Sequence, residues 1–121
     1  MADDLTEKII GAAIEVHRVL GSGLLESVYE GALCHELYLR GVAFRRQVEV
    51  GVIYKDVNVG NQRIDLLVAD AVVVELKSQR ALPEGAAAQV LSYLKATGLK
   101  RGLLLNFGEL RLADGIKRFS L

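Results

Sequence analysis

The chain is 121 residues long, about the length of one domain, and it can bury roughly two-thirds of the surface that its unfolded form exposes. Hydrophobic residues make up 51% of it and charged residues 25%, which excludes a disordered or collagen-like chain. Fifteen basic residues balance fifteen acidic ones, so the strong positive charge of a non-specific nucleic-acid binder is also excluded. Any contact with nucleic acid must come from a local patch.

The cysteine count and the N-terminus indicate the compartment. Cys34 is the only cysteine, which excludes intramolecular disulfides and multi-cysteine zinc sites and suits a reducing environment. The segment Met1–Asp4 is acidic where a signal peptide would be basic, and no apolar run approaches the roughly 20 residues that span a bilayer. With one proline and no linker or repeat, we expect a single cytoplasmic domain over residues 1–121.

Apolar residues recur at helical spacing in three segments, which predicts helices over residues 4–21, 25–41 and 83–98. The segments end at glycines that suit a left-handed C-terminal position, namely Gly21, Gly41 and Gly98.

Strand-like segments fill most of the remaining chain. Alternating or continuous apolar residues predict strands at Val42–Val52, Val57–Val59, Gln62–Ala69, Val72–Lys77 and Leu103–Leu105, and a candidate edge at Leu110–Ala113 with Ile116. The pair Gly60-Asn61 is typical of a turn between the second and third of these strands. The order α-α-β-β-β-β-α-β predicts an α/β fold with a mixed central β-sheet flanked by helices.

Three charged residues interrupt the apolar strands: Asp65, Glu75 and Lys77. Charge buried in a strand is costly unless it is paired or bound to a metal. Glu75 and Lys77 are two residues apart, so they project from one face. A three-residue connection at Ala69–Ala71 places Asp65 opposite Glu75 on that face, whereas a two-residue turn would put them on opposite faces. We predict the three-residue connection.

Two carboxylates this close repel each other unless a cation lies between them, and their hard oxygens favour Mg²⁺ or Mn²⁺ over zinc. The ammonium of Lys77 beside them can hold an attacking water or stabilise the charge that builds on a phosphate. The alternative is a structural salt bridge between Lys77 and one of the acids at the end of a strand.

The segment Gly23–Tyr29 has the pattern G-x-x-E-x-x-Y. Further blocks follow in order at Val16–Gly21, Arg63–Val68, Val74–Lys77, Gln89–Leu94 and Leu105–Gly108. In these blocks, which cover nearly the whole chain, the sequence resembles the bacterial GxxExxY proteins of the PD-(D/E)xK nuclease-like superfamily. The resemblance implies a restriction-endonuclease-like core and a site made of an acid on an early helix, an acid on the second core strand and E-x-K on the third. These positions correspond to Glu26, Asp65, Glu75 and Lys77.

Two further positions have alternative interpretations. Gln89 and Tyr93, four residues apart on one helix face, are similar to the Q-x-x-x-Y element that flanks the metal site in recombination-type and some phage nucleases. The alternative makes Tyr93 a core residue and Gln89 a solvated one. Glu26 falls in the first turn of a helix, where the helix dipole alone stabilises an anion.

The remaining candidates favour structural roles. His17 and His35 lack metal-ligand spacing, and for His17 we expect a hydrogen bond at a helix end. Cys34 is interpreted as a small apolar filler, and Tyr29 as a core residue with its hydroxyl towards the site. Glycine-rich phosphate loops and a Ser-His-Asp order are absent from the sequence.

Charge is uneven along the chain. Residues 1–37 hold seven acidic and two basic residues, so the basic excess lies beyond them. It falls at Arg40, Arg45, Arg46, Lys55, Arg63, Lys95, Lys100, Arg101, Arg111, Lys117 and Arg118. These side chains form either a groove for a nucleic-acid backbone or an ordinary solvated surface.

The hypothesis that follows is a magnesium- or manganese-dependent nuclease. Asp65, Glu75 and the Leu76 carbonyl would bind the metal, with Glu26 in the site directly or through water, while Lys77 orients the hydrolytic water. DNA is expected more than RNA, and a homodimer is expected because so small a domain could hardly enclose a duplex alone. The alternatives are a non-catalytic nucleic-acid or protein binding module with the same fold, and a small-molecule phosphoesterase.

Overall fold

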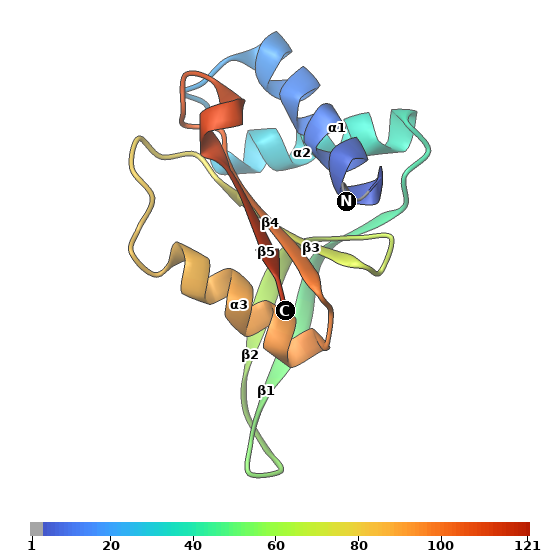
Figure 1. Cartoon of the computed structure of the whole chain (residues 1–121), viewed down its shortest axis with the longest axis vertical. Coiled ribbons are helices and arrows are strands. Elements are labelled where there is room, and N and C mark those ends of the chain that lie inside the picture. Colours follow the sequence, from blue (N-terminus) through green and yellow to red (C-terminus); the bar gives the residue numbers. More distant parts are fainter. Residues whose placement is uncertain (1–3) are drawn as a thin grey trace.

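The computed structural model describes residues 4–121 and has three helices around one five-stranded sheet (Figure 1). The elements are α1 (Asp4–Leu20), α2 (Glu26–Leu39), β1 (Phe44–Tyr54), β2 (Val57–Val68), β3 (Val72–Lys77), α3 (Ala86–Thr97), β4 (Arg101–Asn106), a short 3-10 helix (Leu112–Gly115) and β5 (Ile116–Ser120). The strands are ordered β1-β2-β3-β4-β5; β3 and β4 are parallel and the other neighbours antiparallel. The predicted mixed sheet flanked by helices is confirmed.

The three predicted helices are also confirmed, and glycine ends them as expected. Gly21, Gly41 and Gly98 have φ values of 72°, 71° and 74°, in the left-handed region that glycine adopts without a steric penalty. The acidic start at Met1–Asp3, on which the expectation of no signal peptide rests, lies outside the described residues. Within the described part of the chain, no helix has both the length and the apolar character that crossing a membrane requires.

Two strand predictions were wrong. The segments Val57–Val59 and Gln62–Ala69 form the single strand β2, because pairing with β1 continues through Gly60. The register shifts between Val52 and Ile53, and at this irregularity Asn58 Oδ1 accepts the Gly60 N–H at 2.9 Å. The observed order is therefore α-α-β-β-β-α-β-β. The segment Leu110–Ala113 is not an edge strand, since its end forms the 3-10 helix and the edge strand β5 begins at Ile116.

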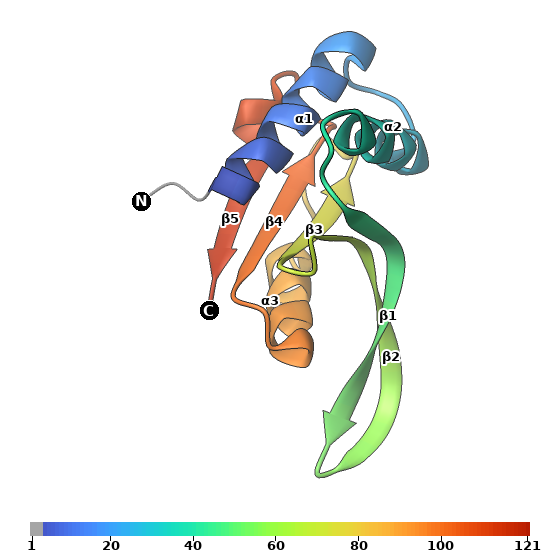
Figure 2. The same cartoon turned by 90° about the vertical axis from the view of Figure 1, so that its right-hand side faces the viewer.

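The sheet is covered on both faces (Figure 2). Helices α1 and α2 pack on one face, where the ring of Tyr29 stacks on Phe107 with centroids 4.5 Å apart. Helix α3 packs on the other face, and it comes so close to β4 that a Cβ at Gly102 would lie 2.8 Å from Val90 Cγ1. The long β1–β2 ribbon extends beyond the other strands (Figures 1 and 2). Because β3 is buried from both sides, its charged residues lie in a largely apolar environment.

Candidate active site

The hairpin between β2 and β3 brings two acids together. Val68 pairs with Val72 across the connection 69–71, and the ladder continues to Leu66 opposite Val74. Continuing this register places Asp65 opposite Glu75, as the three-residue connection predicts. Ala69 and Asp70 both have a φ of 52°, which lets so short a connection reverse the chain.

Beyond the pair Leu66–Val74, the Asp65 side chain takes the place of the β2 backbone as the partner of β3. Asp65 Oδ2 accepts the Leu76 N–H at 2.9 Å. The N–H and C=O of a strand residue point to the same side, so the Leu76 carbonyl also points towards the place where β2 leaves β3. Two acids and a backbone carbonyl thus face one space.

Glu75 is the most constrained of the charged groups. Glu75 is 3% exposed, and its Oε2 lies 3.6 Å from Lys77 Nζ. Its Oε1 is buried without a hydrogen-bond partner. Burial raises the pKa of Glu75, the neighbouring Asp65 carboxyl raises it further, and Lys77 acts in the opposite direction. The Lys77 salt bridge is therefore present, but one carboxylate oxygen has no partner.

Glu26, the first residue of α2, lies in the same electrostatic environment. Burial raises the pKa of Glu26, and so do the charges of Asp65 and Glu30, while Lys77 lowers it. The helix acid and the strand acids therefore lie close enough to influence one another. Glu26 also stands in the first turn of α2, so the helix dipole contributes to its stability as well.

Gln89 and Tyr93 approach these acids from α3. Burial raises the pKa of Tyr93 to about 12, the charges of Glu75 and Asp65 add to the effect, and the hydrogen bond with Gln89 opposes it. Tyr93 is also packed in the apolar cluster under α3. Tyr93 is therefore a core residue that also lies within electrostatic range of the acids.

Sequence reasoning missed a polar chain that supports Asp65. Glu30 is buried; its Oε2 accepts from Arg46 Nη2 at 2.9 Å and its Oε1 from Gln47 Nε2 at 2.6 Å. The same Gln47 Nε2 lies 3.5 Å from Asp65 Oδ1. Gln47 has a φ of 51° in the middle of β1, a strained conformation for this residue type. The position of Glu30, four residues after Glu26 on one helix face, was the available signal.

The other candidates have structural environments. His17 is buried and its Nε2 donates to the Glu109 carbonyl at 2.9 Å, so its hydrogen bond goes to a distant loop. Cys34 is buried, and burial raises the pKa of its thiol to about 11, as suits a filler. Tyr29 is fully buried and its hydroxyl donates to the Gly21 carbonyl.

A divalent cation fits the donors of this site. The orphaned oxygen of Glu75, the Asp65 carboxylate and the Leu76 carbonyl are hard oxygen ligands, which suit Mg²⁺ or Mn²⁺. In residues 4–121, no three acidic, histidine or cysteine side chains form a group that could hold a metal ion. The backbone carbonyl is therefore needed to complete the set.

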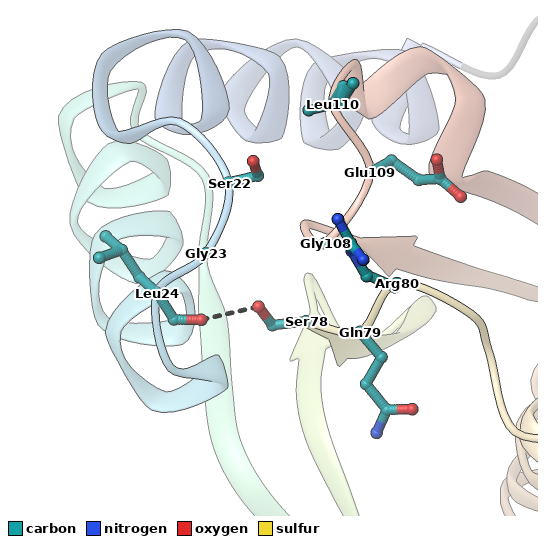
Figure 3. Close-up of a pocket in the computed structure, with 9 residues that line it drawn as sticks. All are labelled: Ser22, Gly23, Leu24, Ser78, Gln79, Arg80, Gly108, Glu109 and Leu110. Carbon is teal, nitrogen blue, oxygen red and sulfur yellow. Dashed lines mark hydrogen bonds between the residues drawn. The ribbon is translucent and has the colours of Figure 1, made fainter.

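A cavity of about 560 Å³ opens beside the loop that follows β3 (Figure 3). Its lining comes from three loops and consists of Ser22, Gly23, Leu24, Ser78, Gln79, Arg80, Gly108, Glu109 and Leu110. Glu26, Asp65 and Glu75 do not line the cavity, but Leu24 lies two residues before Glu26 and Ser78 directly follows Lys77. The cavity and the acids thus share one end of the sheet.

Comparison with known proteins identifies the family of the chain. The family model of the PD-(D/E)XK nuclease superfamily matches residues 3–119. No curated protein and no solved structure matched the chain in the same comparisons. Since the match covers nearly the whole chain, the protein belongs to the PD-(D/E)XK nuclease superfamily.

Proposed function

We propose that this protein is a metal-dependent nuclease of the GxxExxY group that hydrolyses phosphodiester bonds in nucleic acid. Membership of the superfamily supports a nuclease with a nucleic-acid substrate, and PD-(D/E)XK nucleases generally use divalent metals. The observation that carries the proposal is the buried Glu75 carboxylate, which has one unpartnered oxygen, Asp65 beside it and Lys77 at 3.6 Å.

In this proposal Asp65, Glu75 and the Leu76 carbonyl hold Mg²⁺ or Mn²⁺, and Glu26 acts on the bound ion through water. A divalent ion at this point lowers the pKa of a bound water and neutralises charge on the phosphate oxygens. Lys77 orients the hydrolytic water and stabilises the charge that develops on the phosphate. Gln89 and Tyr93 border the same space from α3 and position the acids.

The preferred substrate in this proposal is DNA. The similarity of Gln89 and Tyr93 to the element of recombination-type nucleases favours DNA over RNA. Five of the basic residues considered for a backbone-binding groove are already in ion pairs with carboxylates: Arg40, Arg45, Arg46, Arg63 and Arg118. We therefore expect binding to depend on a few cations close to the site rather than on a long basic stripe.

We further propose a cytoplasmic homodimer formed by one domain per chain. The sequence suggests two contact surfaces, the end of the sheet near Leu103–Ala113 and an apolar helix face. We favour the helix face, because β4 lies between β3 and β5 and has no free edge. The exposed apolar side chains of α1 and α2, with Val19 63% exposed, are the better candidate contact.

A nuclease assay tests the activity. The purified protein is incubated with labelled single- and double-stranded DNA and RNA in the presence of Mg²⁺, Mn²⁺ or chelator. We expect metal-dependent cleavage that Glu75→Gln abolishes. Binding without cleavage under every condition would contradict the nuclease and favour the non-catalytic module.

A further inference from the structure

We infer that the cavity beside the acids binds one unpaired nucleotide of the strand that is cut, so the substrate is single-stranded or frayed at that point. This inference rests on the proposed function and adds the substrate class. The cavity has a volume of about 560 Å³, in the range of sites for small ligands, and loops surround it from three sides (Figure 3). A base pair within a duplex cannot enter such a recess without opening.

The wall of the cavity formed by Ser22, Gly23 and Leu24 is held in place by hydrogen bonds from two side chains. The Tyr29 hydroxyl donates to the Gly21 carbonyl at 2.6 Å and accepts the Leu24 N–H at 3.1 Å. Ser78 Oγ donates to the Leu24 carbonyl at 2.7 Å, which ties this wall to the loop after β3 (Figure 3). The loop before α2 is therefore ordered before any ligand arrives.

The opposite walls are tied together by Asn106, which is 1% exposed. Asn106 Oδ1 accepts the N–H groups of Gln79 and Gly108 at 3.1 and 3.0 Å, and its Nδ2 donates to the Gln79 carbonyl at 2.9 Å. A Cβ at Gly108 would collide with the carbonyl oxygen of Gln79, so only glycine lets these loops approach. His17 then holds the Glu109 carbonyl. A cavity built in this way is preorganised, which reduces the entropic cost of binding.

The lining suits the chemistry of a nucleotide. Arg80 is exposed and has no ion pair or hydrogen bond within the described chain, so its guanidinium is free for a phosphate. Leu110, which is 88% exposed, offers apolar surface to the face of a base, whereas Leu24 turns its side chain away from the cavity and its carbonyl towards Ser78 (Figure 3). Ser22 supplies a hydroxyl for the edge of the base or the sugar, whereas the Gln79 side chain points away from Ser22 and Leu110 (Figure 3). Glu109 points away from the wall formed by Ser22 and Leu24 (Figure 3).

The position of the cavity relates this nucleotide to the cleavage site. Ser78 in one wall directly follows Lys77, and Leu24 in another wall lies two residues before Glu26. Consecutive Cα atoms are about 3.8 Å apart, so both walls are close to the acids. A strand whose scissile phosphate lies at Asp65 and Glu75 therefore reaches the cavity with an adjacent nucleotide. Arg80 would bind that nucleotide's phosphate and act as a substrate-positioning residue.

Binding is measured without metal, so that no strand is cut. A fluorescein-labelled oligothymidylate and a blunt duplex of equal length are titrated with protein in chelator, and fluorescence anisotropy is recorded. We expect preference for the single strand, and about tenfold weaker binding for Arg80→Ala because a charge-assisted hydrogen bond is lost. Lys8→Ala, which removes one exposed positive charge from α1, is the matched control and should bind like the wild type.

A second variant reports on the cavity itself. The chain contains no tryptophan, so Leu110→Trp places a unique fluorophore on the rim. Thymidine monophosphate should quench its emission, whereas the same concentration of inorganic phosphate should not. A response to both ligands alike would contradict a nucleotide site.

The outcomes separate this inference from the proposed function. Weaker single-strand binding by Arg80→Ala in a protein that cuts nothing would support the cavity and overturn the nuclease. Metal-dependent cleavage combined with wild-type binding by Arg80→Ala, or with preference for the intact duplex, would overturn the cavity and leave the nuclease in place.

Discussion

The carboxylate of Asp65 accepts the backbone N–H of Leu76 at 2.9 Å, so an acid of β2 binds the strand that carries Glu75 and Lys77. This bond occupies Asp65 Oδ2 and turns the other oxygen towards Gln47. The orientation of the first acid is thus set by the backbone of the strand that carries the second.

Asp65 and Glu75 should both be needed for metal binding, because each supplies carboxylate oxygen to the same space. Calorimetric titration with Mn²⁺ should show a single site that is lost in Asp65→Asn and in Glu75→Gln. Asp70→Asn is the matched control, since Asp70 pairs with Arg45 in the exposed turn of the same hairpin. Unchanged affinity in both site variants would disprove the site.

Lys77→Ala should remove catalysis while leaving metal binding largely intact. The ammonium acts on water and phosphate, and losing such electrostatic stabilisation typically costs a factor of about 10² to 10³ in rate. Cleavage rates and Mn²⁺ titrations are compared for Lys77→Ala and Lys8→Ala. A Lys77→Ala protein that keeps cleavage within about threefold of the wild type would assign the role to another group.

Gln47→Ala should weaken metal binding although Gln47 is not a ligand. The amide restrains both Glu30 and Asp65, and its removal leaves Glu30 Oε1 without its donor, at a cost of about 1–3 kcal/mol in the free energy of unfolding. Urea unfolding and Mn²⁺ titration measure the two effects. Gln62→Ala, which loses one hydrogen bond to Ser92, serves as control and should lose stability without a change in metal affinity. Equal metal affinity in both variants would refute a positioning role.

The metal-free protein should become less stable as the pH rises above about 4.5, the ordinary pKa of a glutamate. The pKa of Glu75 is raised in the folded state, so the folded chain holds this proton more tightly than the unfolded one and loses that stabilisation as Glu75 ionises. The raised pKa of Glu26 acts in the same direction. Urea unfolding in chelator should give a smaller fall from pH 5 to pH 8 for Glu75→Gln than for the wild type. Identical pH slopes would show that Glu75 is not the titrating group.

The protein should be a homodimer, because the apolar side chains exposed on α1 and α2 gain from burial against a second copy. Light scattering coupled to gel filtration should give about twice the 13.2 kDa of one chain at tens of micromolar protein. Val19→Glu should shift the mass to that of one chain. A wild-type mass of one chain would rule the dimer out.

Local patterns in the sequence were sufficient for the helices and for the pair of acids. The periodic apolar residues ending at Gly21, Gly41 and Gly98 depend on contacts within a few turns, and those helices are where the sequence predicts them. The pairing of Asp65 with Glu75 followed from the length of one short connection, because a side-chain period of two converts turn length into a choice of face. These features are decided by residues that are close together in the chain.

Tertiary structure decided the rest, because the groups concerned meet only after long-range packing. Gln47 joins Glu30 to Asp65 across a helix and two strands, and its positive φ has no signature in a sequence that alternates like an ordinary strand. The cavity requires Leu24, Ser78 and Gly108, from three distant loops, to be held together by Tyr29 and Asn106. The turn predicted at Gly60-Asn61 does not form, because these residues pair with β1. This pairing gives hydrogen-bond partners to backbone groups that a turn would leave exposed. The sequence alone therefore determined the fold class and the main acids, while only the packed structure decided which polar groups orient them and where a ligand enters.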